Sequence, residues 1–139
     1  MPKPTAIVYI DGLNLQRRLV DFLAENIWVD YWRLVESVLP NFSVLAVHVF
    51  TTPITSPEVS VATSIWHAQE RIYPSLSIHP GRMKKTTRIY PLPQSAGNGK
   101  QQNSVKVIKY EEKGSDVALA TRLALDAVRN SASIYYVMT

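Results

Sequence analysis

The sequence predicts a single α/β domain in which helices are layered on a mainly parallel β-sheet. Three observations support this prediction. Short apolar, β-branched runs alternate with segments whose apolar residues recur at helical spacing. The 139 residues are enough for one domain with its own core, and 46% hydrophobic against 19% charged residues is a globular balance. The chain has no cysteine, which excludes disulfides and thiolate-bound zinc.

The first half of the chain predicts two strands and two helices. The run TAIVYI, residues 5–10, lacks polar alternation, as is typical of a strand covered on both faces. Apolar residues then follow helical spacing over residues 13–25. Asp30 is expected to be the N-cap of a second helix that ends before Pro40. Residues 43–51, SVLAVHVFT, predict another buried strand.

A third helix and two short strands are expected next. The tripeptide Ser56-Pro57-Glu58 is typical of a helix start, and this helix is expected to run to about Ile72. Strands are expected over residues 76–79 and 88–91, joined by a connection over residues 81–87.

The last part of the chain predicts a loop, a strand, a helix and a final strand. Residues 91–103 are rich in Pro, Gly, Gln and Asn and predict a mobile loop tip. A strand is expected over residues 105–110. Ser115 is expected to cap a helix that reaches about Val128, and residues 133–138 predict the last strand. This alternation of strands and helices favours the parallel sheet.

Positive charge is concentrated in one segment of the chain. The net charge is +4, and residues 82–113 contain eight cations against only Glu111 and Glu112. Such a basic segment is a natural partner for a polyanion. A solvated loop whose lysines only increase solubility is the alternative. The eight cations are Arg82, Lys84, Lys85, Arg88, Lys100, Lys106, Lys109 and Lys113.

Two polar residues follow the first predicted strand. Ligands of open α/β sheets bind beyond the carboxyl ends of the strands, where Asp11 is expected to lie. Asn14 falls on the first turn of the following helix and can point at the same place. The alternative is a tight hairpin turn at Asp11-Gly12. The helical period that follows counts against a hairpin.

A second acidic residue begins the predicted helix after residue 114. Lys113-Gly114 is expected to form the turn, and Asp116 falls in the first helical turn. An acid at this position also complements the helix dipole without any function. Asp126 lies about 15 Å further along the same helix. It therefore cannot share a site with Asp116 and is expected at the surface.

Two carboxylates at neighbouring strand ends would repel each other unless a cation lay between them. Mg²⁺ or Mn²⁺ suits such oxygen ligands and keeps several waters. A bound ion can hold a phosphate for in-line attack, and the adjacent basic segment suits a sugar-phosphate chain. Asp11 and Asp116 with the basic segment therefore predict a phosphodiesterase.

The histidines and tyrosines offer weaker candidates. His48 falls within a strand pattern and is expected to be a core residue, whereas His67 and His79 lack ligand-like spacing. Tyr90 and Tyr110 lie within the basic segment and are candidates for stacking on bases.

Two motifs together resemble a known family. The sequence YIDGLNL, followed about a hundred residues later by EEKGSDVALATRLALDA, resembles the NYN family of the PIN-like nuclease superfamily, in particular its bacterial LabA-like branch. The resemblance covers nearly the whole chain, residues 1–139, as one domain. It implies a PIN-like three-layer α/β/α sandwich with a mainly parallel central sheet. It also implies Mg²⁺- or Mn²⁺-dependent endoribonuclease activity on single-stranded RNA.

The resemblance implies roles for particular residues. Asp11 matches the acid of the family's IDGxN motif, Asn14 its amide, and Asp116 the acid of its KGSD motif. These three would be catalytic, and Asp11 and Asp116 would hold the metal. Lys113 and Gly114 would shape the turn before Asp116. RNA would be bound by Lys84, Lys85, Arg88, Lys106, Lys109 and Lys113.

The end of the sequence departs from the family pattern. In the PIN-like layout the strand ending at Thr139 lies beside the first strand, next to Asp11, and an acidic motif normally follows. The sequence stops at Thr139, so the sandwich is expected to lack its C-terminal end, with two carboxylates fewer. Weak or absent RNA cleavage is the expectation. Two alternatives stay open: a non-catalytic RNA-binding or regulatory module of the same fold, and a fragment of a longer active protein.

The sequence also bears on location and assembly. No apolar run approaches the roughly 18 residues of a membrane span. Only five apolar residues follow the N-terminal MPKPT before Asp11, so no signal peptide is expected. The expectation is a cytoplasmic protein without a membrane partner. A homo-oligomer is left open.

Overall fold

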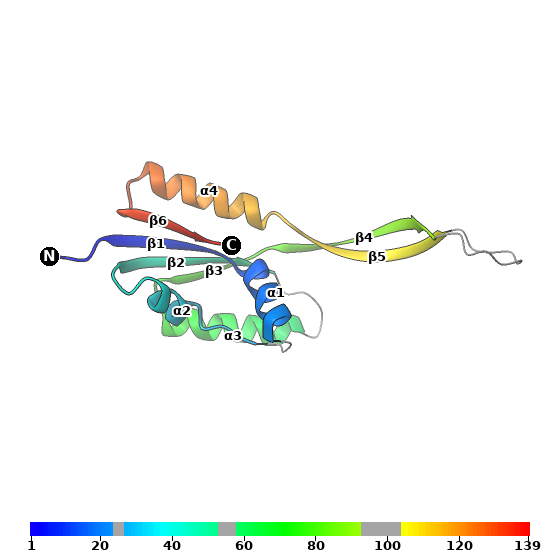
Figure 1. Ribbon diagram of the computed structural model, residues 1–139, viewed down its shortest axis with the longest axis horizontal. Coiled ribbons are helices and arrows are strands. Elements are labelled where there is room, and N and C mark those ends of the chain that lie inside the picture. Colours follow the sequence, from blue (N-terminus) through cyan, green and yellow to red (C-terminus); the bar gives the residue numbers. More distant parts are fainter. Residues whose placement is uncertain (24–26, 53–57, 93–103) are drawn as a thin grey trace, which may run out of the picture.

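A computed structural model describes residues 1–23, 27–52, 58–92 and 104–139. Its centre is a four-stranded parallel sheet in the order β3-β2-β1-β6, and helices lie on both faces (Figure 1). The α/β class and the mainly parallel sheet are thereby confirmed. The strands are β1 (Thr5–Asp11), β2 (Ser43–Thr51), β3 (Leu76–Pro80), β4 (Arg82–Pro91), β5 (Ser104–Lys113) and β6 (Ile134–Met138). The helices are α1 (Gly12–Leu23), α2 (Tyr31–Val38), α3 (Glu58–Ile72) and α4 (Ser115–Val128).

The core explains why β1 is apolar without alternation. Successive side chains of a strand point to opposite faces of its sheet. Val8 packs in one cluster with Val35 of α2 and Trp66 of α3. Its neighbour Ile7 packs in a second cluster, against Leu123 of α4. Both faces of β1 are therefore covered, as its sequence predicts.

Strand β1 lies inside the sheet, between β2 and β6. Asp11 is in register with Phe50 of β2, and Ile10 is in register with Met138 of β6. The expectation that the strand ending at Thr139 lies beside the first strand is confirmed. The side chain of Asn14 is within 3.5 Å of the Thr139 hydroxyl. The carboxyl ends of these parallel strands consequently meet at one edge of the sheet.

The helix starts confirm one expected cap and correct another. Asp30 accepts a hydrogen bond from the Arg33 backbone N–H at 3.0 Å, as an N-cap should. Helix α4 is not capped by Ser115. Its N-cap is Gly114, whose φ of 93° suits glycine, and Ser115 is the first helical residue. Glu112 replaces the expected cap, because its Oε1 accepts the Ser115 N–H at 2.9 Å.

Strands β4 and β5 form an antiparallel hairpin that we call the arm. It projects away from the rest of the molecule, the body (Figure 1). The expected connection over residues 81–87 is wrong, because β4 already begins at Arg82. Likewise β5 extends to Lys113 instead of ending at residue 110. At about 3.3 Å per residue each strand is about 33 Å long.

Some of the expected features fall on residues that the structure does not describe. Ser56, Pro57 and the loop over residues 93–103 lie outside the described residues, as does Lys100. The third helix ends at Ile72 as expected. No helix in the described ranges is long and apolar enough to span a bilayer.

Candidate active site

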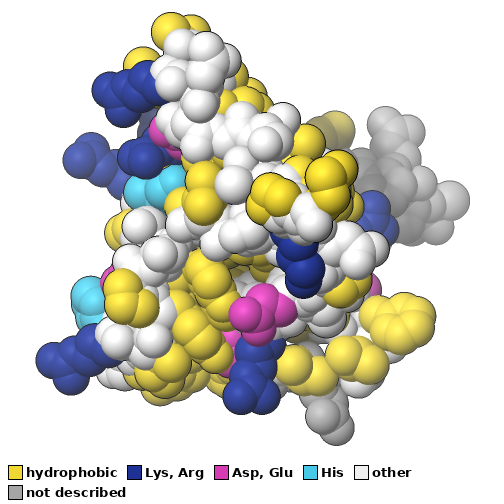
Figure 2. Space-filling model, turned by 90° about the vertical axis from the view of Figure 1, so that its left-hand side faces the viewer, with side chains coloured by type: hydrophobic (Ala, Val, Ile, Leu, Met, Phe, Trp, Pro, Cys, Tyr) yellow, Lys and Arg dark blue, Asp and Glu magenta, His cyan; other side chains and the backbone are white. Residues whose placement is uncertain are grey.

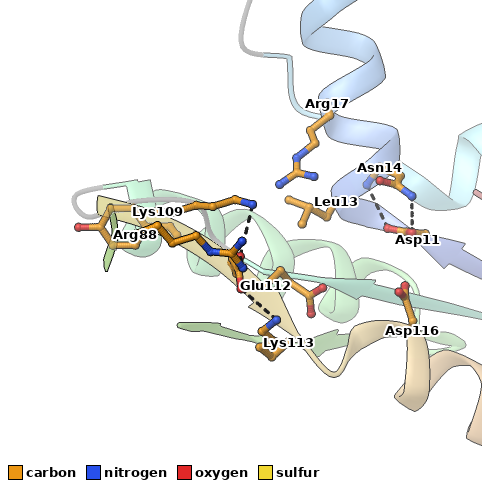
Figure 3. A pocket seen from close by; sticks show the side chains of 11 residues that line it. Asp11, Leu13, Asn14, Arg17, Arg88, Lys109, Glu112, Lys113 and Asp116 are labelled. Atoms are coloured by element: carbon orange, nitrogen blue, oxygen red, sulfur yellow. Dashed lines mark hydrogen bonds and ion pairs between the residues drawn. The ribbon is translucent and has the colours of Figure 1, made fainter. Parts of the chain in front are cut away.

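A cleft of about 430 Å³ opens at the carboxyl edge of the sheet, between α1, the arm and the start of α4 (Figure 3). It contains all three residues expected to be catalytic, Asp11, Asn14 and Asp116. The chain reaches it from opposite ends of the sequence, through the β1–α1 junction and through the β5–α4 junction. The lining residues are Asp11, Leu13, Asn14, Arg17, Arg88, Lys109, Tyr110, Glu111, Glu112, Lys113 and Asp116.

Asp11 is the most constrained acid of the cleft. It is the last residue of β1, is 9% exposed, and is followed directly by α1. Its Oδ1 accepts the Asn14 backbone N–H at 3.0 Å, and its Oδ2 accepts the Asn14 amide N–H at 2.7 Å. Each carboxylate oxygen has a second lone pair that these hydrogen bonds do not use. The side chain is held in one orientation and can still accept a cation.

Asn14 contacts Asp11 rather than standing free in the cleft. Because its backbone N–H and its amide donate to both oxygens of Asp11, the contact that the structure shows is a positioning one. The role expected of Asn14, to orient a water or a phosphate, stays a prediction. The alternative of a hairpin turn at Asp11-Gly12 is excluded, because Gly12 is the first residue of α1.

Asp116 enters the cleft from the first turn of α4, and its side chain is exposed. Its charge complements the dipole of α4, as expected. It also lines the same cleft as Asp11, which the dipole alone does not require. The prediction that these two carboxylates share a site is therefore consistent with where the chain places them.

The cleft contains two further acids, Glu111 and Glu112, that were not predicted as site residues. Glu112 caps α4 and points into the cleft between Lys113 and Asp116 (Figure 3). Glu111 accepts ion pairs from three cations: Lys113 at 3.0 Å, Arg88 at 3.1 Å and Lys109 at 3.3 Å. Hydrogen bonds from Lys113 and Lys109 hold the pKa of Glu111 below its usual range. In the sequence, the consecutive acids Glu111 and Glu112 between Lys109 and Lys113 could have indicated them as site residues.

The cations expected to bind RNA divide into two groups. Arg88, Lys109 and Lys113 line the cleft, whereas Lys84, Lys85 and Lys106 do not. Arg17, which was not predicted as a site residue, faces the arm from α1 (Figure 3). The position of Arg17 in the sequence could have indicated that it belongs to the site. It lies three residues after Asn14, and residues three apart share a helix face.

The acids of the cleft are of the ligand type that a hard divalent ion takes. No group of three or more His, Cys, Asp or Glu side chains in the described part of the chain is arranged to hold a metal. Mg²⁺ does not need such a cage, because it is often bound by one or two carboxylates, with waters and substrate phosphates as the other ligands. Asp11 and Asp116 supply that minimal set. Metal binding by these two residues stays a proposal.

A second polar cluster lies outside the cleft and corrects one expectation. Asp126 was expected at the surface, but it is 3% exposed and is one of the buried residues of α4. It accepts hydrogen bonds from the Tyr9 hydroxyl at 2.8 Å and from Arg122 Nε at 2.9 Å. These donors satisfy the carboxylate, so burial is tolerated. Burial alone raises the pKa of Asp126, but donation from Arg122 and Tyr9 outweighs it and lowers the pKa.

His48 adjoins this cluster. As expected it is a core residue, 4% exposed, and its Nδ1 lies 3.2 Å from Nε2 of His79. Its Nε2 lies 4.0 Å from Asp126 Oδ2 and has no hydrogen-bond partner among the described residues. Burial, assisted by the positive charge of Arg122, lowers the pKa of His48 to about 4. None of these residues lines the cleft.

Gly81 joins the body to the arm at a place without room for a side chain. A Cβ atom there would lie 2.6 Å from Ser115 Oγ and 2.9 Å from Glu112 Oε1, and closer still to Thr52 Oγ1. The hydroxyls of Thr52 and Ser115 are buried, and neither has a hydrogen-bond partner within the described ranges. Gly81, the residue before β4, is therefore packed tightly against Thr52, which follows β2, and against the start of α4.

The chain matches no model of a known protein family, and no curated protein or solved structure shows detectable similarity to it. The likeness to the NYN family stays an interpretation of two motifs. The geometry of the cleft is the observation on which a function can be proposed.

Proposed function

We propose that this protein is a Mg²⁺- or Mn²⁺-dependent endoribonuclease of the PIN-like, NYN type that acts on single-stranded RNA. One observation supports this above all. Asp11 and Asp116, distant in the sequence, line one cleft together with Arg17, Arg88 and Lys113. Carboxylates suit a hard cation, and the guanidinium and ammonium groups suit phosphates. The parallel sheet with helices on both faces is compatible with a PIN-like sandwich.

Each group has a distinct task in this proposal. Asp11 and Asp116 would hold the ion, and Asn14 keeps the Asp11 carboxylate in place. When bound, the ion would offset the charge of the scissile phosphate and acidify a water for in-line attack. Arg17, together with Arg88, Lys109 and Lys113 of the arm, would hold the neighbouring phosphates. These interactions orient the strand and do not read its sequence.

Cleavage of a fluorescent single-stranded RNA with Mn²⁺ tests the proposal. We expect Asp11→Asn and Asp116→Asn each to lower the rate by roughly 100-fold or more, since each removes a ligand charge. Asp21→Asn is the matched control, because Asp21 is an exposed acid of α1 outside the cleft. Binding of Mn²⁺, followed by calorimetry, should weaken in the same two variants. Undiminished cleavage by both would refute the proposal.

A non-catalytic RNA-binding module is the second candidate. The observation that favours it is that no set of three acids suited to a metal occurs among the described residues. This candidate predicts RNA binding that is indifferent to EDTA, with no cleavage at any Mn²⁺ concentration. It also predicts that Asp11→Asn leaves the affinity for RNA unchanged or raises it, because an acid facing the phosphates is removed.

A further inference from the structure

The pairing of β4 with β5 sorts the basic residues of the arm onto two faces. Residues that pair across an antiparallel ladder point to the same face. Lys84 pairs with Glu111, and Thr86 with Lys109, whereas Lys85 pairs with Tyr110. One side of the arm, which we call the cationic face, therefore carries five cations around one acid: Arg82, Lys84, Arg88, Lys109 and Lys113 around Glu111. The opposite face carries Lys85 and Lys106 with Met83, Ile89, Ile108, Tyr110 and Glu112, and of these Tyr110 and Glu112 also line the cleft.

Glu111 holds part of the cationic face in a fixed arrangement. Its side chain is 16% exposed, and the three cations that contact it, Arg88, Lys109 and Lys113, are 52–59% exposed. Lysine has three donors and arginine five, so one shared carboxylate leaves most of their N–H groups free. All three cations also line the cleft. The cationic face is thus partly organised before any ligand binds, and it is continuous with the cleft.

The dimensions of the cationic face suit an extended strand. Same-face residues two apart in a strand are about 6.8 Å apart, comparable with the spacing of successive phosphates in an extended single strand. From Arg82 to Arg88 the row is about 20 Å long on the same scale. Tyr90, exposed and on the same face, lies one position further toward the tip, where its ring is available for stacking. The end of the molecule opposite the arm differs, because its Lys and Arg side chains occupy several separate places among hydrophobic and polar groups (Figure 2).

We propose that the cationic face of the arm is a guide for single-stranded RNA that holds about three phosphates outside the cleft, while the opposite face stays free of RNA. The guide depends on the proposed function for the chemistry in the cleft, but it is tested by binding alone. The excess of positive charge, the spacing and the adjacent tyrosine together favour a nucleic-acid strand over an acidic polypeptide.

A matched pair of double variants tests the guide. Lys84→Ala with Lys109→Ala removes one lysine from each strand on the cationic face. Lys85→Ala with Lys106→Ala removes the same charge from the opposite face. All four side chains are exposed, so both variants should fold. Fluorescence anisotropy of a 5′-labelled oligonucleotide, recorded over a range of salt concentrations in an Asp116→Asn background, measures affinity without cleavage.

We expect the first double variant to lose roughly tenfold in affinity, and its salt slope to fall by about 1.4, since each lost phosphate contact contributes about 0.7. The second should stay within about twofold of the parent. Equal losses in both would overturn the assignment to one face. Competition by polyglutamate as effective as by RNA would overturn the assignment to a nucleic acid. If binding depends on the face but the chain with Asp116 intact does not cleave RNA, the guide stands and the nuclease is refuted. If that chain cleaves RNA but both double variants lose affinity equally, the nuclease stands and the guide is refuted.

Discussion

The body and the arm are stabilised by different interactions. Six of the seven residues of β1 are buried. No residue of β4 or of β5 is buried. Burial of apolar surface stabilises the body. The arm is held by its hydrogen-bonded ladder and by cross-strand pairs, which alone make a two-stranded hairpin only marginally stable. The arm can therefore carry a dense positive charge that the body could not bury.

The cleft lies where these two regions meet. The body supplies Asp11, Asn14 and Asp116, and the arm supplies Arg88 and Lys109. Residues that must be held rigidly belong to the packed region, and residues that need only attract a polyanion belong to the exposed one.

The largest effect should come from matched truncations in the two regions. Ile10→Ala removes a fully buried side chain from β1, and Ile89→Ala removes one that is 71% exposed on β4. We expect the first to lower the free energy of unfolding by about 2–5 kcal/mol through lost burial and a cavity. The second should change it by under about 0.5 kcal/mol. Urea denaturation measures both, and similar losses would show that the arm is packed like the body.

Acid should destabilise the body through His48. Its pKa is about 4 in the folded protein, against about 6.5 when it is exposed. The unfolded chain therefore binds the proton more tightly, so stability is complete above pH 6.5 and is lost as the pH falls toward 4. The difference is about 3 kcal/mol, and the lowered pKa of His79 acts in the same direction.

Thermal unfolding of wild type and of His48→Asn between pH 7 and pH 4 measures this loss. The variant should show a flatter dependence on pH. His67→Asn is the control, because His67 is exposed on α3 and its replacement should leave the wild-type dependence intact. If His48→Asn loses as much stability in acid as the wild type, the attribution of this pH dependence to His48 is wrong.

The junction at Gly81 should be sensitive to one methyl group. Gly81→Ala places a Cβ against Ser115, Glu112 and Thr52, and such overpacking costs about 1–3 kcal/mol. Thr52→Ala removes the nearest of these atoms and, with it, a hydroxyl that has no partner among the described residues. The double variant should recover part of the loss, because Ser115 Oγ would still lie 2.6 Å from the new Cβ. A double-mutant cycle by urea denaturation measures the coupling, and strictly additive losses would show that Thr52 is not the obstacle.

The smallest effect should come from the ion pairs of the arm. Glu111→Gln keeps the shape of the side chain and removes its charge, which is shared with Lys113, Arg88 and Lys109. Exposed ion pairs contribute little to stability because water and salt screen them. We expect the free energy of unfolding to stay almost unchanged, as measured by urea denaturation at low and high salt. A clear loss at low salt alone would show that these pairs support the arm.

Several features could be predicted from sequence because their signals are local. The apolar run before Asp11, the helical period after it, the cap at Asp30 and the acid after Gly114 each lie within a few neighbouring residues. The carboxyl-end rule then places Asp11 at the edge of the sheet, whereas Asp116 follows β5, which belongs to the arm and not to the parallel sheet. The start of β4 was missed because residues 82–87 are polar and lack alternation, so their strand conformation depends on pairing with β5.

Periodicity and capping were sufficient to predict the order of strands and helices, the covered first strand and the two acids at strand and helix ends. The remaining features depend on contacts between segments far apart in the sequence. Asp126 is buried because Tyr9 and Arg122, from β1 and from α4, satisfy it. Lys84 and Lys85 point to opposite faces because a strand alternates its side chains, and only the pairing with β5 shows that Lys84 shares its face with Lys109 and Lys113, which line the cleft.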